Sequence, residues 1–245
     1  MQSTGVVPPR FAQPIALGGL LFFLDALLYF AYRYEVVFAR ELAGPIGTAA
    51  VTVDVALFTV FALHHSVFAR DAFRKPITRL VGVLERSIYV WVASAMFIAV
   101  CAWWQPVAGV AWRLHEPSVV WPLRATQLLG VWLTLRSAWI IDFFALAGAR
   151  QVWRDEGDDS EPAGPMVFKT SGPYGRVRHP IYAGWFLLVF PVPIMTMTQF
   201  VFALTSSVYL LIAIPFEERS LRRSSAGAYD EYMKQVRWKL LPHVY

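Results

Sequence analysis

Long apolar runs alternate with short polar segments along most of the chain. Six such runs are present, at residues 15–34, 48–68, 87–105, 124–147, 181–198 and 199–216. Because a membrane-spanning helix needs about 20 mostly apolar residues, each run predicts a transmembrane helix. The last two runs are short, have almost no loop between them and are interrupted by Pro191 and Pro193. We therefore expect them to form a short, tilted or kinked hairpin.

Composition supports the same fold class. Hydrophobic residues make up 57% of the 245 residues and the mean hydropathy is +0.47, while charged residues make up only 16%, against about 25% in soluble domains. We therefore predict an all-α integral membrane protein with about six transmembrane helices. A net charge of +5 needs no nucleic acid partner to explain it. Cys101 is the single cysteine, which excludes an intrachain disulfide and a cysteine metal cluster, and no metal site is expected.

The lysines and arginines are distributed unevenly between the two sides of the predicted membrane. With six spans, the side that holds both termini receives 17 of the 22 basic residues, and the other side receives four. Basic loops favour the cytosolic side of a membrane. We therefore expect both termini, the loops 69–86 and 148–180, and the tail 217–245 to be cytosolic.

The tail that follows the last apolar run reads "PFEERSLRRSSAGAYDEYMKQV". Glu217 and Glu218 come directly at the predicted helix exit, where a carboxylate beside anionic lipid calls for a cationic partner. Beyond them the pattern predicts an amphipathic cytosolic helix, with Tyr229, Tyr232 and Val236 on or near one face, of the kind that lies at a membrane interface.

Several ionisable residues lie within or near the predicted spans. They are Asp25, Asp54, His64, His65, Arg136 and Asp142. A charge at the bilayer centre costs about 2.5–3.5 kcal/mol on insertion scales, so we expect these side chains to face the bundle interior. There they serve either as hydrogen-bonding groups between helices or as the lining of a substrate pocket.

The stretch "GPYGRVRHPIYAGW" places polar residues where the fifth apolar run begins. Pro180 suits the first turn of a helix, which puts His179 near its N-cap. A helix N-terminus attracts anions, and Arg178 and His179 add further donors. The stretch therefore predicts a binding site for a carboxylate or phosphate, with lipid-headgroup anchoring as an equal alternative.

"TSGPYGRVRHPIYAGW", followed about 30 residues later by "EERSL" and "AYDEY", resembles the isoprenylcysteine carboxyl methyltransferase and phospholipid methyltransferase superfamily. A closer resemblance extends upstream through "FALHHSVFAR", "ERSIYVWVASAMF", "WWQPVAGVAW" and "ARQVW". These segments are similar to the nurim-type group, which includes bacterial methanethiol S-methyltransferase. The resemblance covers residues 55–243.

The resemblance implies an enzyme of the bacterial inner membrane that uses S-adenosylmethionine as its cofactor. The cofactor contacts known for the family match three parts of this sequence. These are a segment before the Arg-His-Pro turn, the turn itself and the glutamates after the last span. The matched or adjacent positions are Met166, Val167, Phe168, Lys169, Tyr174, Arg178, His179, Pro180, Ile181, Tyr182, Glu217 and Glu218. In this interpretation the 1–245 chain is one methyltransferase domain, with a four-helix membrane half at 1–147 and a cofactor-binding half at 148–245.

The acceptor that the resemblance implies is a small or lipophilic thiol, as in the conversion of methanethiol to dimethyl sulfide. The thiol must be held deprotonated, which calls for nearby cationic or donor groups, so His64, His65 and Arg136 are the catalytic candidates, with or without a dedicated base. The alternatives are a lipid, amine or carboxylate acceptor, a non-enzymatic nurim-like membrane protein, and a transporter. Membrane lipid is an expected partner, and no obligate protein partner is indicated.

Overall fold

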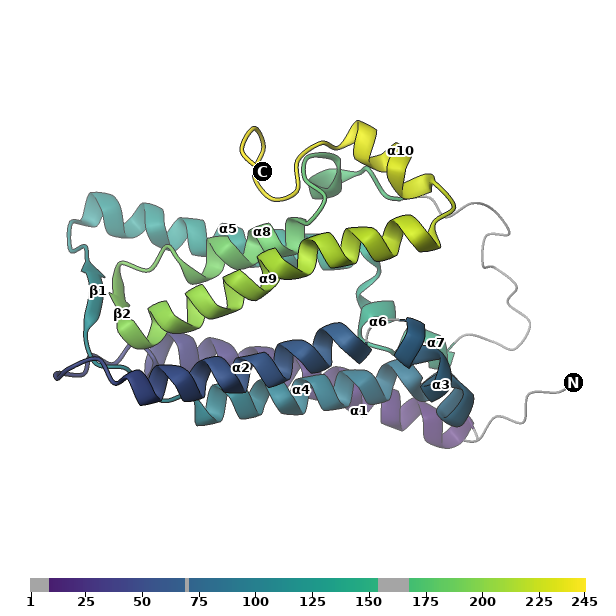
Figure 1. Ribbon diagram of the computed structural model, residues 1–245, viewed down its shortest axis with the longest axis horizontal. Helices are drawn as coiled ribbons and strands as arrows, with labels where there is room; N and C mark the ends of the chain where they lie inside the picture. Colours follow the sequence, from purple (N-terminus) through teal and green to yellow (C-terminus); the bar gives the residue numbers. More distant parts are fainter. Residues whose placement is uncertain (1–8, 69–70, 154–167) are drawn as a thin grey trace, which may run out of the picture. The chain divides into compact units, whose positions relative to one another are not determined.

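The computed structural model describes residues 9–68, 71–153 and 168–245, and these residues are nearly all helical (Figure 1). The chain divides into two compact units that interleave along the sequence. Met166 and Val167, two of the predicted cofactor-binding residues, lie outside the described residues. The assignment of separate roles to residues 1–147 and 148–245 stays a prediction.

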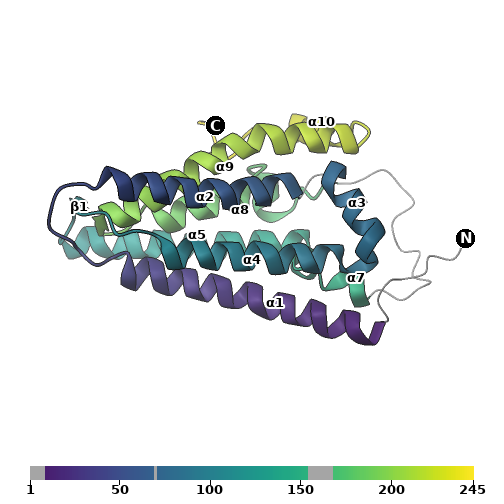
Figure 2. The same ribbon diagram turned by 60° about the horizontal axis from the view of Figure 1, so that its bottom comes forward.

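The first unit is built on three long helices. Its elements are α1 (Pro9–Tyr32), the π-helix η1 (Arg33–Val37), α2 (Thr48–Phe68), α3 (Asp71–Val81), the 3₁₀-helix η2 (Gly82–Leu84), α4 (Glu85–Trp103), α6 (Phe143–Leu146) and α7 (Arg150–Trp153). Helices α1 and α2 both pack against α4 (Figure 2). Gly18 allows α1 to approach closely, because a Cβ atom there would lie 2.9 Å from the Trp91 ring. Trp91 in turn donates its indole N–H to the carbonyl of Ile15 at 2.9 Å.

The second unit contains the remaining helices and both strands. Its elements are β1 (Val110–Arg113), α5 (Pro117–Ile141), the 3₁₀-helix η3 (Gly172–Gly175), α8 (Pro180–Val189), β2 (Ile194–Thr196), α9 (Met197–Ser224) and α10 (Ala228–Gln235). Helices α5 and α8 cross at two glycines. A Cβ atom on Gly130 would lie 2.7 Å from the carbonyl oxygen of Gly184, so no larger residue fits without moving a backbone. Small residues permit this kind of close helix crossing in membrane proteins.

Four of the described helices are long and apolar enough to cross a membrane: Phe11–Val37, Thr48–Phe68, Phe73–Trp103 and Met197–Ser224. The chain is therefore a membrane protein, as predicted. The predicted run 124–147 corresponds to α5, which ends at Ile141 because Asp142 takes a left-handed conformation with φ of 92° and caps α6. Helix α5 does not reach the apolarity of the other four.

The predicted helix 181–198 is much shorter in the structure. Helix α8 has only ten residues and ends at Val189, before Pro191 and Pro193. Beyond the prolines the chain forms β2, which pairs antiparallel with β1 through Val110 opposite Thr196. The strictly all-α prediction missed this small sheet, because strands of three and four residues leave too little alternation in the sequence to detect.

Helix α9 differs from its prediction at the other end. It starts with a capping box between Thr196 and Gln199 and runs for 28 residues to Ser224. Glu217 and Glu218 therefore lie inside a continuous helix rather than at its exit. Since Glu, Arg, Ser and Leu are all acceptable in a helix, the end of the apolar run did not mark the end of the helix. Helix α10 lies within the segment predicted to form an amphipathic cytosolic helix, and its place at a membrane interface stays a prediction.

Candidate functional site

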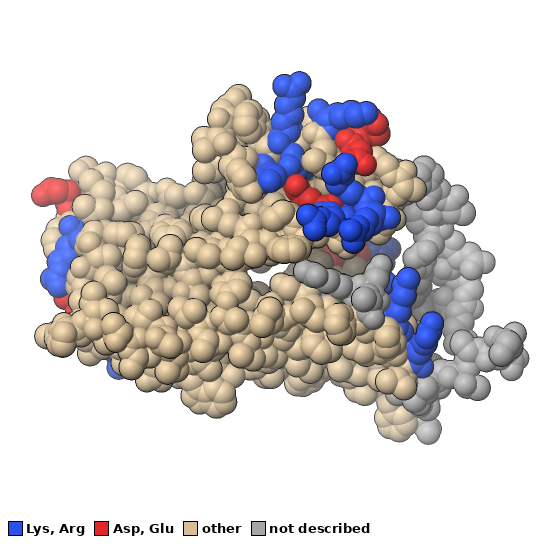
Figure 3. All heavy atoms as spheres, viewed as in Figure 1, with Lys and Arg blue, Asp and Glu red and all other residues tan. Residues whose placement is uncertain are grey.

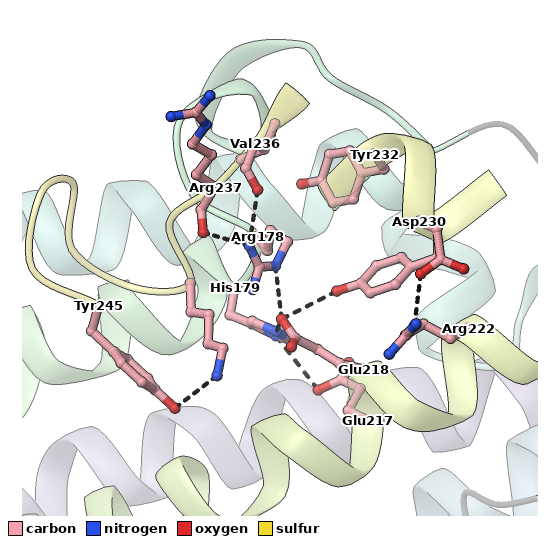
Figure 4. A network of polar contacts seen from close by, with 12 residues as sticks. Arg178, His179, Glu217, Glu218, Arg222, Asp230, Tyr232, Val236, Arg237 and Tyr245 are labelled. Carbon is pink, nitrogen blue, oxygen red and sulfur yellow. Dashed lines mark hydrogen bonds and ion pairs between the residues drawn. The ribbon is translucent and has the colours of Figure 1, made fainter. Parts of the chain in front are cut away.

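The motif that contains Arg178 meets two other segments within the second unit. It follows η3 and leads into α8, as the sequence predicted, with Pro180 in the first turn and His179 as N-cap. Figure 4 shows that these side chains face Glu217 and Glu218 of α9 and the segment that follows α10. Residues that are far apart in the sequence thus form a single polar network.

Arg178 and Glu218 form its buried centre. Nε of Arg178 donates to Oε1 of Glu218 at 2.7 Å, and the two side chains are only 4% and 9% exposed. Nη1 of Arg178 donates to the carbonyl oxygens of Val236 at 2.9 Å and Arg237 at 2.6 Å. The guanidinium therefore has protein partners on both sides, and it joins α8, α9 and the segment after α10.

His179 lies between the two glutamates. Its Nε2 is 3.2 Å from Oε1 of Glu218, and its Nδ1 is 3.7 Å from Oε2 of Glu217. The backbone N–H groups of Arg178 and His179 donate to the carbonyls of Trp238 and Lys239, each at 2.9 Å. These two N–H groups are therefore occupied by the chain itself, and the anion site at the start of α8 stays a prediction.

Glu217 is the open carboxylate of the network. Its side chain is 45% exposed, and its Oε2 accepts the Tyr182 hydroxyl at 2.8 Å. Among the described residues none pairs with its Oε1. Tyr182 also stacks on the ring of His179, with centroids 5.4 Å apart and an interplanar angle of 15°. Glu217 can therefore accept hydrogen bonds from a bound molecule, while Tyr182 and His179 fix its position.

Aromatic side chains pack beside the network. Phe168 contacts Tyr229 edge-on at 4.9 Å and stacks on Tyr232 at 5.7 Å. The Tyr232 hydroxyl donates to the carbonyl of Tyr174 at 2.8 Å, and the Tyr229 hydroxyl donates to Oε1 of Glu218 at 3.4 Å. Burial raises the pKa of Tyr232 to about 12 and also raises the pKa of Tyr174 and Tyr229. All three phenols are therefore neutral donors at physiological pH.

The structure brings together most of the predicted cofactor residues that it describes. Phe168, Tyr174, Arg178, His179, Tyr182, Glu217 and Glu218 lie in or directly beside this network. Lys169 instead donates from Nζ to the carbonyl of Ile140. The sequence placed Tyr229 and Tyr232 only on or near one face of an interfacial amphipathic helix, and it gave no sign of the backbone carbonyls of residues 236–239. The only signal was that Tyr229 and Tyr232 are three residues apart, which places both rings on one face of a helix.

Two of the predicted catalytic residues lie together in the first unit. Nδ1 of His65 is 2.9 Å from the Tyr89 hydroxyl, which also lies 3.0 Å from the carbonyl oxygen of His65. The ring of His64 lies 6.0 Å from that of Tyr89, and Arg86 lies over the Tyr89 ring at 4.8 Å. Tyr89 was not predicted, although it stands in the "ERSIYVW" motif.

Of the other ionisable residues in the predicted spans, some are buried in the structure and others are exposed at its surface. Asp54 is fully buried, and its Oδ1 accepts the N–H of Gln105 at 2.7 Å. Asp142 pairs with Arg150. Asp25 and Arg136 are exposed at the surface of the chain, against the expectation that they face the interior. For Arg136 this means that α5 presents a cation at its surface.

Comparisons with known proteins identify relatives of the whole chain. A protein from Crocosphaera subtropica named methanethiol S-methyltransferase is 37% identical over 188 residues, which cover 76% of this chain and 73% of that protein. A protein of the same name from Mycobacterium tuberculosis is 36% identical over 201 residues, 80% of each chain. Nurim from Xenopus laevis is 29% identical over 169 residues, 65% of this chain and 58% of nurim.

No family model matches the chain. No solved structure matches it either. The identity to the bacterial proteins nevertheless extends over most of both chains, well beyond the single motif around Arg178. The chain therefore belongs to the methanethiol S-methyltransferase family, a group of methyltransferases that is related in sequence to nurim.

Proposed function

We propose that this protein transfers a methyl group from S-adenosylmethionine to a small thiol such as methanethiol, with dimethyl sulfide as the product. The observation that carries the proposal is the open carboxylate of Glu217, held by Tyr182 beside His179, in a chain whose bacterial relatives carry the methanethiol S-methyltransferase name. S-adenosylmethionine supplies the methyl group as an electrophile on a sulfonium.

The residues of the network fit the polar groups of this cofactor. Oε1 of Glu217 can accept from an ammonium group or a ribose hydroxyl, since it has no partner among the described residues. Tyr174 and Tyr182 are neutral aromatic rings that can face the sulfonium, because a cation is attracted to a ring face. Arg178 and Glu218 satisfy each other, so we assign them to holding Glu217 and His179 in position rather than to direct contact.

The thiol side of the reaction requires that a proton be removed. His65 is the favoured base among His64, His65 and Arg136. When the Tyr89 hydroxyl donates to the His65 carbonyl, Nδ1–H of His65 donates to the hydroxyl oxygen in return, and Nε2 keeps its lone pair. A lone pair at Nε2 can accept the thiol proton. His64 and Arg136 remain candidates for stabilising the thiolate.

The proposed topology has six crossings with both termini in the cytosol of a bacterial cell, at the inner membrane. Helix α8 alone is about 15 Å long and cannot cross. The chain bends at Phe190 and Pro193 and then forms β2, and we assign α8 together with residues 190–196 to one crossing. Val192 and Met195 are buried, as irregular backbone at membrane depth requires. Helix α5, with 25 residues, has the length of a further span.

Cofactor titration and product detection test the proposal together. Purified protein in detergent should give saturable heat on titration with S-adenosylmethionine, and it should release dimethyl sulfide when methanethiol is added. Absence of saturable binding would overturn every methyltransferase interpretation. Binding without dimethyl sulfide, but with labelled lipid, amine or carboxylate product, would show that the acceptor is of another class.

A further inference from the structure

Helix α9 has an exposed apolar face along the part that precedes the site. The large exposed side chains on it are Leu204, Val208, Leu211, Ile212 and Phe216. At about 100° per residue these positions fall within an arc of about 140°. Since α9 is one of the helices long and apolar enough to span a membrane, acyl chains of lipid are the surroundings that this face requires.

Three arginines continue the same face. Arg219, Arg222 and Arg223 are exposed and fall within the same arc, one turn beyond Phe216. Together with Asp230 of α10 they line a shallow, open cleft. Figure 3 shows the lysine and arginine side chains gathered over the C-terminal part of α9 and over α10.

The charges in the cleft leave an excess of positive charge. Nε of Arg222 pairs with Oδ1 of Asp230 at 2.7 Å (Figure 4), which fixes one guanidinium at the wall of the cleft. Arg219 and Arg223 form no ion pair with any residue that the structure describes. Within the part of the chain that the structure describes, the cleft therefore offers two guanidinium groups without an acidic partner, the chemistry that binds a phosphate.

The spacing along the helix matches one leaflet of a membrane. From Leu204 to Phe216 the helix rises about 18 Å, and half of the hydrocarbon core is about 15 Å thick. The apolar face thus covers the depth of one layer of acyl chains, and the arginines follow at the level of the headgroups.

We propose that α9 binds an anionic phospholipid, with its phosphate in the cleft of Arg219, Arg222 and Arg223 and its acyl chains along the face from Leu204 to Phe216. Glu217 projects from the opposite side of the same turn, about 160–170° away from the centre of the arc. A lipid bound here therefore holds Glu217 and its network at headgroup level. This inference is independent of the methyl acceptor.

Native mass spectrometry of the full-length protein tests the site. The probes are phosphatidylglycerol and phosphatidylcholine with identical acyl chains, added to the protein in detergent. We expect the protein to retain phosphatidylglycerol roughly 25-fold better, because Arg219 and Arg223 at the membrane surface each contribute about a factor of five. Equal retention of the two lipids would overturn the proposal.

Charge-matched variants separate a specific site from general attraction. Arg219→Gln/Arg223→Gln should abolish the preference while leaving the Arg222–Asp230 pair intact. Lys234→Gln/Arg237→Gln removes the same charge from α10 and the segment after it and should leave the preference unchanged. A similar loss in both variants would overturn the proposal, as would displacement of phosphatidylglycerol by millimolar inorganic phosphate, which would identify a free-anion site. Should the first variant fail to fold, the wild-type comparison of the two lipids decides alone.

Discussion

Nε of Arg178 lies 2.7 Å from Oε1 of Glu218, although 40 residues separate them in the sequence. Both side chains are almost completely buried. Removing one partner of a buried ion pair leaves the other charge without compensation, which typically costs about 3–5 kcal/mol. The pair therefore determines whether the network around Glu217 holds together.

Arg178→Ala should strongly destabilise the second unit, because it removes the cationic partner of the buried Glu218 and the guanidinium donor to the carbonyls of Val236 and Arg237. The expected loss is about 3–5 kcal/mol, measured as a lower unfolding temperature in detergent. Arg176→Ala, two residues away and exposed, is the matched control and should unfold near the wild-type temperature. Equal stability of the two variants would show that the ion pair is not structural.

Glu217→Gln should weaken cofactor binding without unfolding the protein. The loss of a charged acceptor costs about 1.5–3 kcal/mol, which corresponds to about a ten- to hundredfold weaker affinity for S-adenosylmethionine in calorimetry. Tyr182→Phe removes the hydroxyl that holds Glu217 and should weaken affinity by a smaller factor. If Glu217→Gln binds the cofactor as tightly as the wild type, Glu217 is not a cofactor ligand.

His65→Gln should lower the turnover of methanethiol about a hundredfold, as expected for loss of a general base, with unchanged affinity for S-adenosylmethionine. Trifluoroethanethiol is a small thiol that ionises more readily, so its turnover should fall much less. Tyr89→Phe should show the same pattern more weakly, because the ring of His65 then lacks its partner at Nδ1. An equal loss of turnover for both thiols would show that His65 has a structural role and is not the general base.

Gly130→Ala should separate α5 from α8. The added methyl group would lie 2.7 Å from the carbonyl oxygen of Gly184, and overpacking of this kind costs about 1–3 kcal/mol. The thermal unfolding temperature in detergent should fall. Leu128→Ala changes an exposed residue of the same helix and should have little effect; a larger effect there would contradict the assigned packing.

The raised pKa of Tyr232 predicts that the folded protein loses stability at alkaline pH. Its pKa in the folded protein is about 12, above the value of about 10 for an exposed tyrosine. Folding therefore favours the neutral phenol, and this contribution is complete below about pH 10 and is lost as the pH rises towards 12. The unfolding temperature should fall over that interval. Tyr232→Phe should show a shallower fall, whereas Tyr245→Phe, at an exposed position, should follow the wild type.

Local structure was predicted correctly from the sequence at residue types that strongly restrict the backbone, such as proline. Pro180 marked a helix start because its fixed φ suits the first turn, and Pro191 and Pro193 marked the interruption that ends α8. The arginine, histidine and glutamates of the two motifs do meet, as the resemblance implied. These features depend on side chains whose positions are visible in the sequence.

Other features depend on partners that the sequence does not reveal. The carbonyls of residues 236–239 that occupy Arg178 and the N–H of His179 belong to the backbone, so no residue type signals them. The true end of α9 was hidden because a helix continues equally well through Glu217 and Ser224 once the apolar run has ended. Tyr89 gave no signal in isolation, since its role comes from contact with a histidine on another helix.

The crossing of α5 and α8 also affects the order of events during protein synthesis. Nε2 of Gln127 donates to the carbonyl of Leu188 at 3.1 Å, and 61 residues of chain lie between them. A ribosome adds about 5–20 residues per second, so α5 waits roughly 3–12 seconds before its neighbour is made. During that interval the glycine surface at Gly130 and the amide of Gln127 are open to whatever else is in the membrane. The nascent protein therefore has an interval of several seconds in which α8 cannot yet cover this surface of α5.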